Sequence, residues 1–186
     1  MDLPAALRIQ ARANRLANRR LHAAVAGLPA AEFGAPRTGF FPSLAATLNH
    51  VLAVDAYYIG ALGADPAIAA AYQAFEPAAD LGSLTARQAA SDERLIAFCD
   101  RLDAAGCDAV VEMDRGGGTV QRDRAAHVLQ HLFMHQTHHR GQAHAMLSST
   151  TAAPPQLDEF LMPRDAPLRA ADMAALGWDE RAIYGG

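Results

Sequence analysis

Apolar residues recur at intervals of three and four along much of the chain, which is the spacing of one face of an α-helix. Four long stretches keep this pattern and predict helices at residues 4–26, 43–62, 83–105 and 123–149. Two short apolar runs within residues 109–122 flank three consecutive glycines, a pattern typical of a β-hairpin. The chain is therefore predicted to be all-α, with one small hairpin before its last long helix.

The remaining stretches are rich in proline, alanine and glycine. Residues 63–82 are predicted to be irregular, with one helical turn at most. Pro154 and Pro155 end the last long helix, because proline cannot continue a helix. Residues 156–186 then form a tail with a short helix at 168–176, and the apolar residues of this tail are expected to pack onto the long helices.

Three polar residues interrupt the apolar faces of the first two helices. Asn14 and Asn18 lie on the apolar stripe of the first helix, and Asp55 falls in the middle of the stripe of the second. Buried amides and carboxylates are costly unless they are hydrogen-bonded, so we expect the asparagines to meet a polar partner or a polar cavity. Asp55 is interpreted as a partner of an Arg or Asn on a neighbouring helix, or as an acceptor for an imidazole N–H, in preference to a catalytic base.

The last long helix carries an unusual concentration of histidine, with five of the eight histidines within residues 127–142. His135 and His139 border its apolar face four residues apart, so their side chains are neighbours at the spacing at which two imidazoles hold one metal ion. His131 and His135 have the same spacing and are the alternative pair. One helix face cannot surround an ion, so a third ligand is needed, and His50 on the second helix is the best donor.

The other histidines are interpreted differently. His22, His127 and His144 are expected at the surface, and His138 is expected to form an outer hydrogen bond. Three protein ligands would leave a coordination position for water or substrate, which is typical of a catalytic metal site. The alternative is that the histidines only pack and form hydrogen bonds, and the position of His50 on a separate helix argues against it.

Composition excludes several classes of protein. The net charge is −4 with neutral histidines, so the overall field does not favour nucleic-acid binding. No apolar run approaches the roughly 20 residues that a membrane-spanning helix needs. Cys99 and Cys107 are the only cysteines, and they lack the spacing of a metal site or a disulfide framework. Together with the absence of a recognisable signal peptide, this predicts a cytoplasmic protein.

Several motifs resemble the DinB family of damage-inducible proteins. The two most specific are TLNH at residues 47–50 and HQTHHRGQ at residues 135–142. Asn14 and the runs ANRRL at 17–21 and FFPS at 40–43 extend the resemblance through the first half of the chain. The chain departs from the family in the first helix, where Ala13 and Leu16 stand at positions that often hold aromatic residues. These two positions are expected to widen the cavity or change its lining, so the substrate of a relative is not carried over.

The resemblance covers roughly residues 7–162, which divides the chain into a bundle at 1–162 and a C-terminal extension at 163–186. It implies a four-helix bundle with up-down-down-up connectivity that is commonly dimeric. It also implies a divalent transition metal, nickel or zinc first of all, held by three histidines. Carried over position by position, these histidines are His50, His135 and His139.

Two functions follow from the resemblance and the histidines together. The first is a metal-dependent transferase or hydrolase. In it a low-molecular-weight thiol bound to the metal would be transferred to a small electrophile or used in an isomerisation, or a metal-bound hydroxide would hydrolyse the substrate. The second is a non-catalytic metal-binding protein, a stress-response or sensor protein that acts as a homodimer.

Further residues are expected around the ion in the enzyme hypothesis. Asn49 or Asp55 would orient the ligands. The cavity that receives the thiol or the small-molecule substrate would be lined by Asn14, Asn18 and Tyr57. A fourth ligand from His131 or His138 would instead favour a structural or sensing site, because a closed coordination sphere has no position for a substrate.

Overall fold

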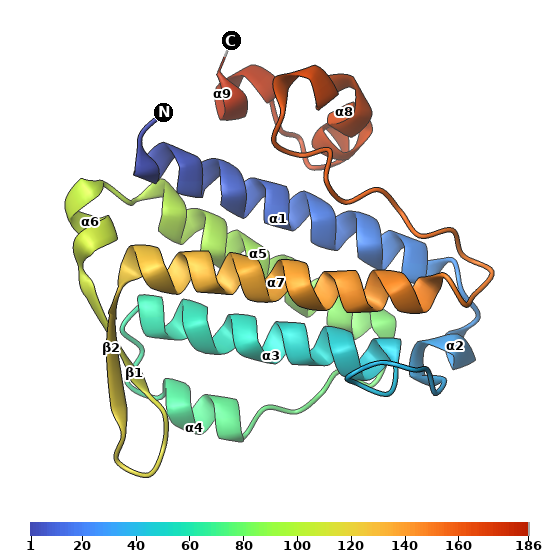
Figure 1. The fold of residues 1–186 in the computed structure, drawn as a ribbon, viewed down its shortest axis with the longest axis horizontal. Helices are drawn as coiled ribbons and strands as arrows, with labels where there is room; N and C mark the ends of the chain where they lie inside the picture. The colour runs from blue at the N-terminus through green and yellow to red at the C-terminus, as the bar shows by residue number, and fades with distance from the viewer. Residues whose placement is uncertain (186) are drawn as a thin grey trace.

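The structure is a computed structural model, and it describes residues 1–185. The described chain is mostly helical, with one two-stranded antiparallel sheet (Figure 1). In chain order the elements are α1 (Leu3–Ala26), α2 (Ala30–Gly34), α3 (Leu44–Leu62), α4 (Ile68–Gln73), α5 (Leu81–Asp100), α6 (Ala104–Asp108), β1 (Val110–Asp114), β2 (Val120–Arg124), α7 (Ala125–Leu147), the 3₁₀ helix η1 (Pro163–Asp165), α8 (Ala166–Ala175) and α9 (Glu180–Tyr184). The predicted helical class and the hairpin before the last long helix are confirmed.

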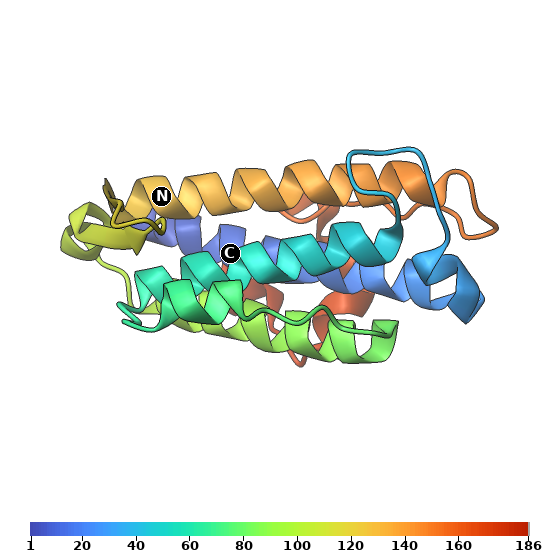
Figure 2. The same cartoon turned by 90° about the horizontal axis from the view of Figure 1, so that it is seen from below.

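The four longest helices lie side by side, as Figures 1 and 2 show from two directions. α1 and α7 run in one direction, and α3 and α5 run in the opposite direction. α1 packs against α5 and α7, and α3 packs against the same two helices. None of the helices in the described part of the chain is both long and apolar enough to cross a membrane.

Side-chain caps decide where several helices begin. Ser43, the predicted cap of α3, accepts a hydrogen bond at Oγ from the backbone N–H of Ala46, 3.1 Å away. The prediction of one helix over residues 83–105 is wrong at its C-terminal end. α5 begins earlier, because Asp80 caps it, and the chain then starts a new helix, α6, where Asp103 accepts a hydrogen bond from Gly106 N–H.

Loss of the Asp80 cap should weaken α5 measurably. Asp80 Oδ1 accepts a hydrogen bond from Ser83 N–H over 2.8 Å. We expect Asp80→Ala to lower the free energy of unfolding by about 1 kcal/mol, the usual contribution of such a cap. Urea denaturation measures this, with Asp158→Ala, at an exposed position outside the helices, as the control. Equal stability of the two variants would contradict the assigned role of the cap.

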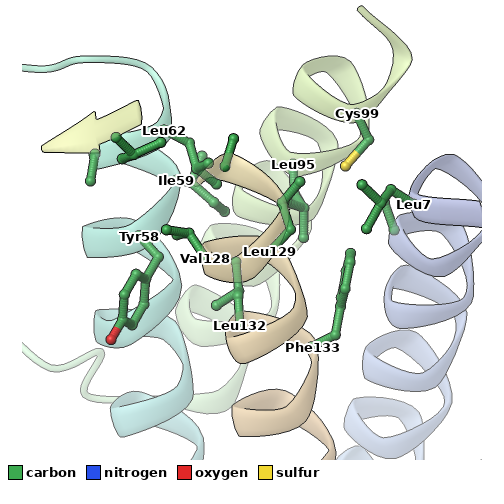
Figure 3. Packing of buried hydrophobic residues seen from close by; sticks show 14 of the residues in the cluster. Leu7, Tyr58, Ile59, Leu62, Leu95, Cys99, Val128, Leu129, Leu132 and Phe133 are labelled. Atoms are coloured by element: carbon green, nitrogen blue, oxygen red, sulfur yellow. The ribbon is translucent and has the colours of Figure 1, made fainter. Parts of the chain in front are cut away.

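The apolar core lies where the four long helices meet. In Figure 3, Leu129 and Leu132 of α7 stand at its centre, and Leu95 of α5 and Leu7 of α1 approach them from the neighbouring helices. All four are buried. The N-terminal half of α7 packs into this core, which fixes the position of α7 along the other helices. It therefore also fixes the level at which the histidines of α7 lie.

The C-terminal segment packs on the outside of α1. Arg20 forms ion pairs of 2.8 Å with both Glu159 and Asp172. Ala13 and Leu16 of the first helix face this segment and pack against its apolar side chains. These two positions were expected to widen or reline the cavity, and the structure places them against the tail instead. The domain boundary at residue 162 stays a prediction.

His22 was expected at the surface, and this prediction is wrong. Its side chain is 4% exposed, between α1 and α5, and its Nδ1 lies 3.0 Å from Thr85 Oγ1. The apolar stripe of α1 is wider than the sequence pattern suggested, because the helix is covered by α5 and α7 and by the C-terminal segment. Burial, and then the positive charges of Arg15 and Arg140, lower the pKa of His22 to about 4.

This lowered pKa predicts an acid-sensitive contribution to stability. Between pH 6.5 and about 4 the unfolded chain takes up a proton at His22 and the folded chain does not, so stability is full above pH 6.5 and is lost as the pH falls toward 4. We expect the stability difference between wild type and His22→Gln to shrink over this window by up to about 3 kcal/mol. Urea titrations across the window measure it, with His127→Gln as an exposed control that should follow the wild type.

Candidate metal centre

Three histidines from two helices converge on one point. His50 of α3 meets His135 and His139 of α7, and one ring nitrogen from each lies within 4.8 Å of the others. His50 Nε2 and His135 Nε2 are 3.0 Å apart. The ring centroids of His135 and His139 are separated by 4.4 Å, as expected for neighbours one helical turn apart.

Gln142 holds one of these rings in a fixed orientation. Its Oε1 accepts a hydrogen bond from His139 Nδ1 over 2.8 Å. The proton of His139 is therefore on Nδ1, and Nε2 is left with a free lone pair. Gln142 Nε2 in turn donates to His138 Nε2 over 3.1 Å. Sequence reasoning missed Gln142, although its place three residues after His139 on the same helix was a usable signal.

Phe41 forms an apolar wall beside the histidines. Its ring centroid lies 4.5 Å from that of His50 and 5.7 Å from that of His139. The loop that carries it is closed by Arg37, whose N–H donates to Pro42 O over 2.7 Å and whose guanidinium pairs with Glu32. The sequence marked this loop only as part of a motif and gave Phe41 no role in the site.

The three imidazoles are neutral at physiological pH. Burial, followed by the neighbouring imidazoles, lowers the pKa of His135 to about 3. Burial also lowers the pKa of His50, with a smaller effect of His139, and it lowers the pKa of His139 against the opposing effect of the hydrogen bond to Gln142. A neutral imidazole is the form that binds a metal ion, so the electrostatics suit a ligand set.

The donor set fits a transition-metal ion. Two nitrogens that bind one tetrahedral ion at about 2.0–2.1 Å are roughly 3.3 Å apart, close to the 3.0 Å between His50 and His135. Three imidazoles suit zinc, nickel, copper or iron. His131 and His138 lie outside this group of three among the described residues. In the structure His50 therefore joins the pair of His135 and His139, and not the alternative pair of His131 and His135.

Comparison with known families agrees with these residues. The profile of the DinB family matches residues 9–173, which is most of the chain. The chain belongs to the DinB family. A search of curated proteins finds no match to this chain. The match includes all three converging histidines and extends into α8, beyond the end of the resemblance at residue 162.

A cavity of about 330 Å³ adjoins the histidines of this DinB protein. His135 and His131 line it from α7, and Tyr57 lines it from α3. Tyr57 had been expected in the cavity wall. Its hydroxyl donates a hydrogen bond to the backbone oxygen of Asp114 over 2.6 Å, which ties the β-hairpin to α3.

Asn49 has a structural contact where a ligand-orienting role was expected. Its side-chain Nδ2 donates to Ala78 O over 3.1 Å, and its Oδ1 accepts from Ala78 N–H over 2.7 Å. These two bonds fasten the segment before α5 to α3. Asn49 therefore stabilises the helix that carries His50 and makes no hydrogen bond to the imidazole.

Asn14, Asn18 and Asp55 belong to a second, fully buried polar cluster of this DinB protein. The buried network is made of Asn14, Asn18, Asp55, Gln88, Asp92, Gln136 and Arg140. Arg140 donates to Asn14 and to Asn18, and Asn18 donates to Asp92 over 2.8 Å. The asparagines had been expected to meet a polar partner or to line the substrate cavity. The structure gives them polar partners, and they are not among the residues that line the cavity beside His135.

Asp55 contacts amides in this network, and no imidazole. Its Oδ2 accepts hydrogen bonds from Gln136 and from Gln88, the latter over 2.7 Å. The four members that sequence reasoning missed are Gln88, Asp92, Gln136 and Arg140. Gln136 and Arg140 stand beside two of the histidines in the sequence, but the helical rotation of about 100° per residue turns them to another, buried face of α7.

One buried guanidinium faces two buried carboxyls in the network. Burial, and then the charge of Asp92, raise the pKa of Asp55 well above its usual value. Burial raises the pKa of Asp92 to about 7, and it lowers the pKa of Arg140 to about 10. Asp55 is therefore harder to ionise than an exposed carboxyl, and the charges of Arg140 and of Arg15, which lies 3.7 Å from Asp92, favour the ionised form of Asp92.

Proposed function

We propose that this DinB protein is a metal-dependent enzyme in which His50, His135 and His139 hold one divalent transition-metal ion, with nickel and zinc as the first candidates. The observation that carries the proposal is the convergence of three neutral imidazoles from two helices beside a cavity. Three protein ligands leave at least one coordination position for a substrate. The four long helices would form the up-down-down-up bundle of the family.

The proposed reaction is a thiol-dependent transfer or isomerisation on a small electrophile, with hydrolysis as the variant. A divalent ion at this position would lower the pKa of a thiol or water that it binds and would polarise a carbonyl group. Gln142 would keep His139 Nε2 directed at the ion, and Phe41 would exclude water from one side. The cavity beside His135 would hold the electrophile next to the reacting group.

The alternative function is a non-catalytic stress-response or sensor protein that acts as a dimer. Two exposed apolar side chains favour it, Phe40 at 80% and Met134 at 72% exposure. They are the sequence neighbours of Phe41 and His135, so an apolar surface flanks the histidines. A homodimer and a cytoplasmic location remain predictions.

Metal content tests the proposal directly. We expect elemental analysis of protein purified without an affinity tag to find about one transition-metal ion per chain. His139→Ala should lose the ion. His127→Ala, an exposed histidine on the same helix, should keep it. Absence of metal from the wild type, even after incubation with each candidate ion, would refute the ligand assignment.

A turnover assay distinguishes the proposed enzyme function from the alternative binding function. The metal-loaded protein is mixed with a low-molecular-weight thiol and 1-chloro-2,4-dinitrobenzene, and the loss of free thiol is followed. Hydrolysis is followed with 4-nitrophenyl acetate. Metal-dependent turnover that is absent in His139→Ala would support catalysis. Bound metal without turnover on either substrate, together with a stable dimer in solution, would favour the alternative function.

A further inference from the structure

The cavity beside the metal centre has an aromatic wall. Tyr57 and Tyr58 of α3 line it, and Tyr72 of α4 closes it from the other side. The ring centroid of Tyr57 lies 5.3 Å from those of both Tyr58 and Tyr72, and the rings meet edge to face. Flat apolar faces in a cavity of this size suit a planar organic body.

A single arginine lines the same cavity. The guanidinium carbon of Arg115 lies 5.3 Å from the ring centroids of Tyr57 and Tyr58, within cation–π distance of both. Its Nη2 donates to Tyr58 Oη over 3.1 Å, and its Nε donates to Gln121 Oε1 over 2.9 Å. These partners are neutral. Within residues 1–185, no carboxylate forms a salt bridge with Arg115 at 4.0 Å or less.

The β-hairpin holds this arginine in place. Arg115 opens the turn between β1 and β2, where its N–H donates to Thr119 O over 2.8 Å. Three glycines with positive φ angles complete the turn, a backbone conformation that other residues rarely adopt. Asp114, the acidic residue of the cavity wall, accepts a hydrogen bond from Gly116 N–H with its carboxylate and so is engaged within the turn.

The cavity thus combines groups of different chemistry. His135 of the metal centre lines it, the tyrosines form an aromatic wall, and Arg115 supplies a positive charge without a salt-bridge partner within residues 1–185. A guanidinium in this situation is suited to a carboxylate, which it can bind through two parallel hydrogen bonds.

We propose that Arg115 binds the carboxylate of the substrate, so that the substrate class is a planar, apolar or aromatic carboxylic acid whose other end reaches the metal. The statement that the other end of the substrate reaches a metal ion rests on the proposed function. Binding of the acid by Arg115 requires only the cavity and can be measured without metal.

A pair of matched ligands tests the charge requirement. 2-Naphthoate and the neutral 2-naphthamide have nearly the same shape, and calorimetric titration gives the affinity of each for metal-free protein. We expect the acid to bind about tenfold more tightly than the amide, because one charge-assisted contact to arginine contributes on that order. Arg115→Gln should abolish the preference. Arg122→Gln, on the same hairpin but paired with Glu112 at the surface, should keep it.

Folding effects of the substitution are controlled separately. Arg115→Lys keeps the charge and should keep part of the preference for the acid, and thermal melting shows whether each variant is folded. Equal binding of acid and amide to the wild type would overturn the proposal, as would a preference that survives in Arg115→Gln.

Repeating the titrations with zinc-loaded protein separates this proposal from the metal assignment. A preference for the acid that appears only with zinc, and that persists in Arg115→Gln, would show that the metal binds the carboxylate. This result would overturn the role of Arg115. A protein that binds no zinc but still prefers the acid through Arg115 would refute the proposed metal enzyme and leave the acid-binding cavity established.

Discussion

Arg140→Met is expected to lower the free energy of unfolding by about 3–5 kcal/mol, the usual cost of removing one partner from a buried ionic group. Arg140 donates to the side-chain oxygens of Asn14, Asn18 and Gln136. Methionine would leave these oxygens without a donor, and it would leave Asp92 with Arg15, 3.7 Å away, as its remaining countercharge. Urea denaturation at neutral pH measures the loss.

Two further variants make this result specific. Arg124→Met removes an exposed arginine at the start of α7 whose partner is Asp108, and it should cost less than about 1 kcal/mol. Asp92→Asn, added to Arg140→Met, should recover part of the loss, because the second substitution removes a buried carboxylate that has lost one of its two countercharges. A cost for Arg140→Met no larger than that for Arg124→Met would show that the network does not need its cation.

Zinc should stabilise the wild type strongly and His135→Ala hardly at all. An ion that binds only the folded state stabilises it by about 4 kcal/mol when its free concentration is a thousand times Kd. For a chain of this length, that corresponds to a rise in Tm of about 10 °C. Thermal melts with zinc and with a chelator measure the shift.

The control for this experiment is His131→Ala, one turn earlier on α7. His131 lines the cavity but lies outside the group of three histidines, so its loss should leave the zinc effect almost unchanged. A zinc effect of equal size in His135→Ala would mean that the ion binds elsewhere on the protein.

The sequence pattern located the helices well and their ends less well. The spacing of apolar residues is a property of a whole helix, so α1, α3 and α7 were found within two residues of their observed bounds. The break between α5 and α6 depends on the cap formed by Asp103. A single capping side chain does not change the spacing of the apolar residues, so the pattern does not reveal it. His22 was misplaced because its burial against α5 cannot be read from the helix itself.

The site was predictable to the extent that it lies along one helix. His135 and His139 follow from a spacing of four residues, and His50 was selected as the histidine of the second helix. The contribution of Arg115 was not predictable, because the hairpin reaches the cavity only through tertiary packing. Arg140 and Asp92 were missed for the same reason: the pairing of buried charges depends on how α5, α1 and α7 are rotated toward one another.

The separation of the histidines along the chain has a kinetic consequence. His50 and His135 are 85 residues apart, and they meet only when α3 has docked on α7. Before docking, an ion can be held by no more than the local pair on α7. An interaction that forms only after the transition state slows unfolding without accelerating folding. An ion bound only after the two helices have docked would lengthen the lifetime of the folded state and leave the rate of folding unchanged.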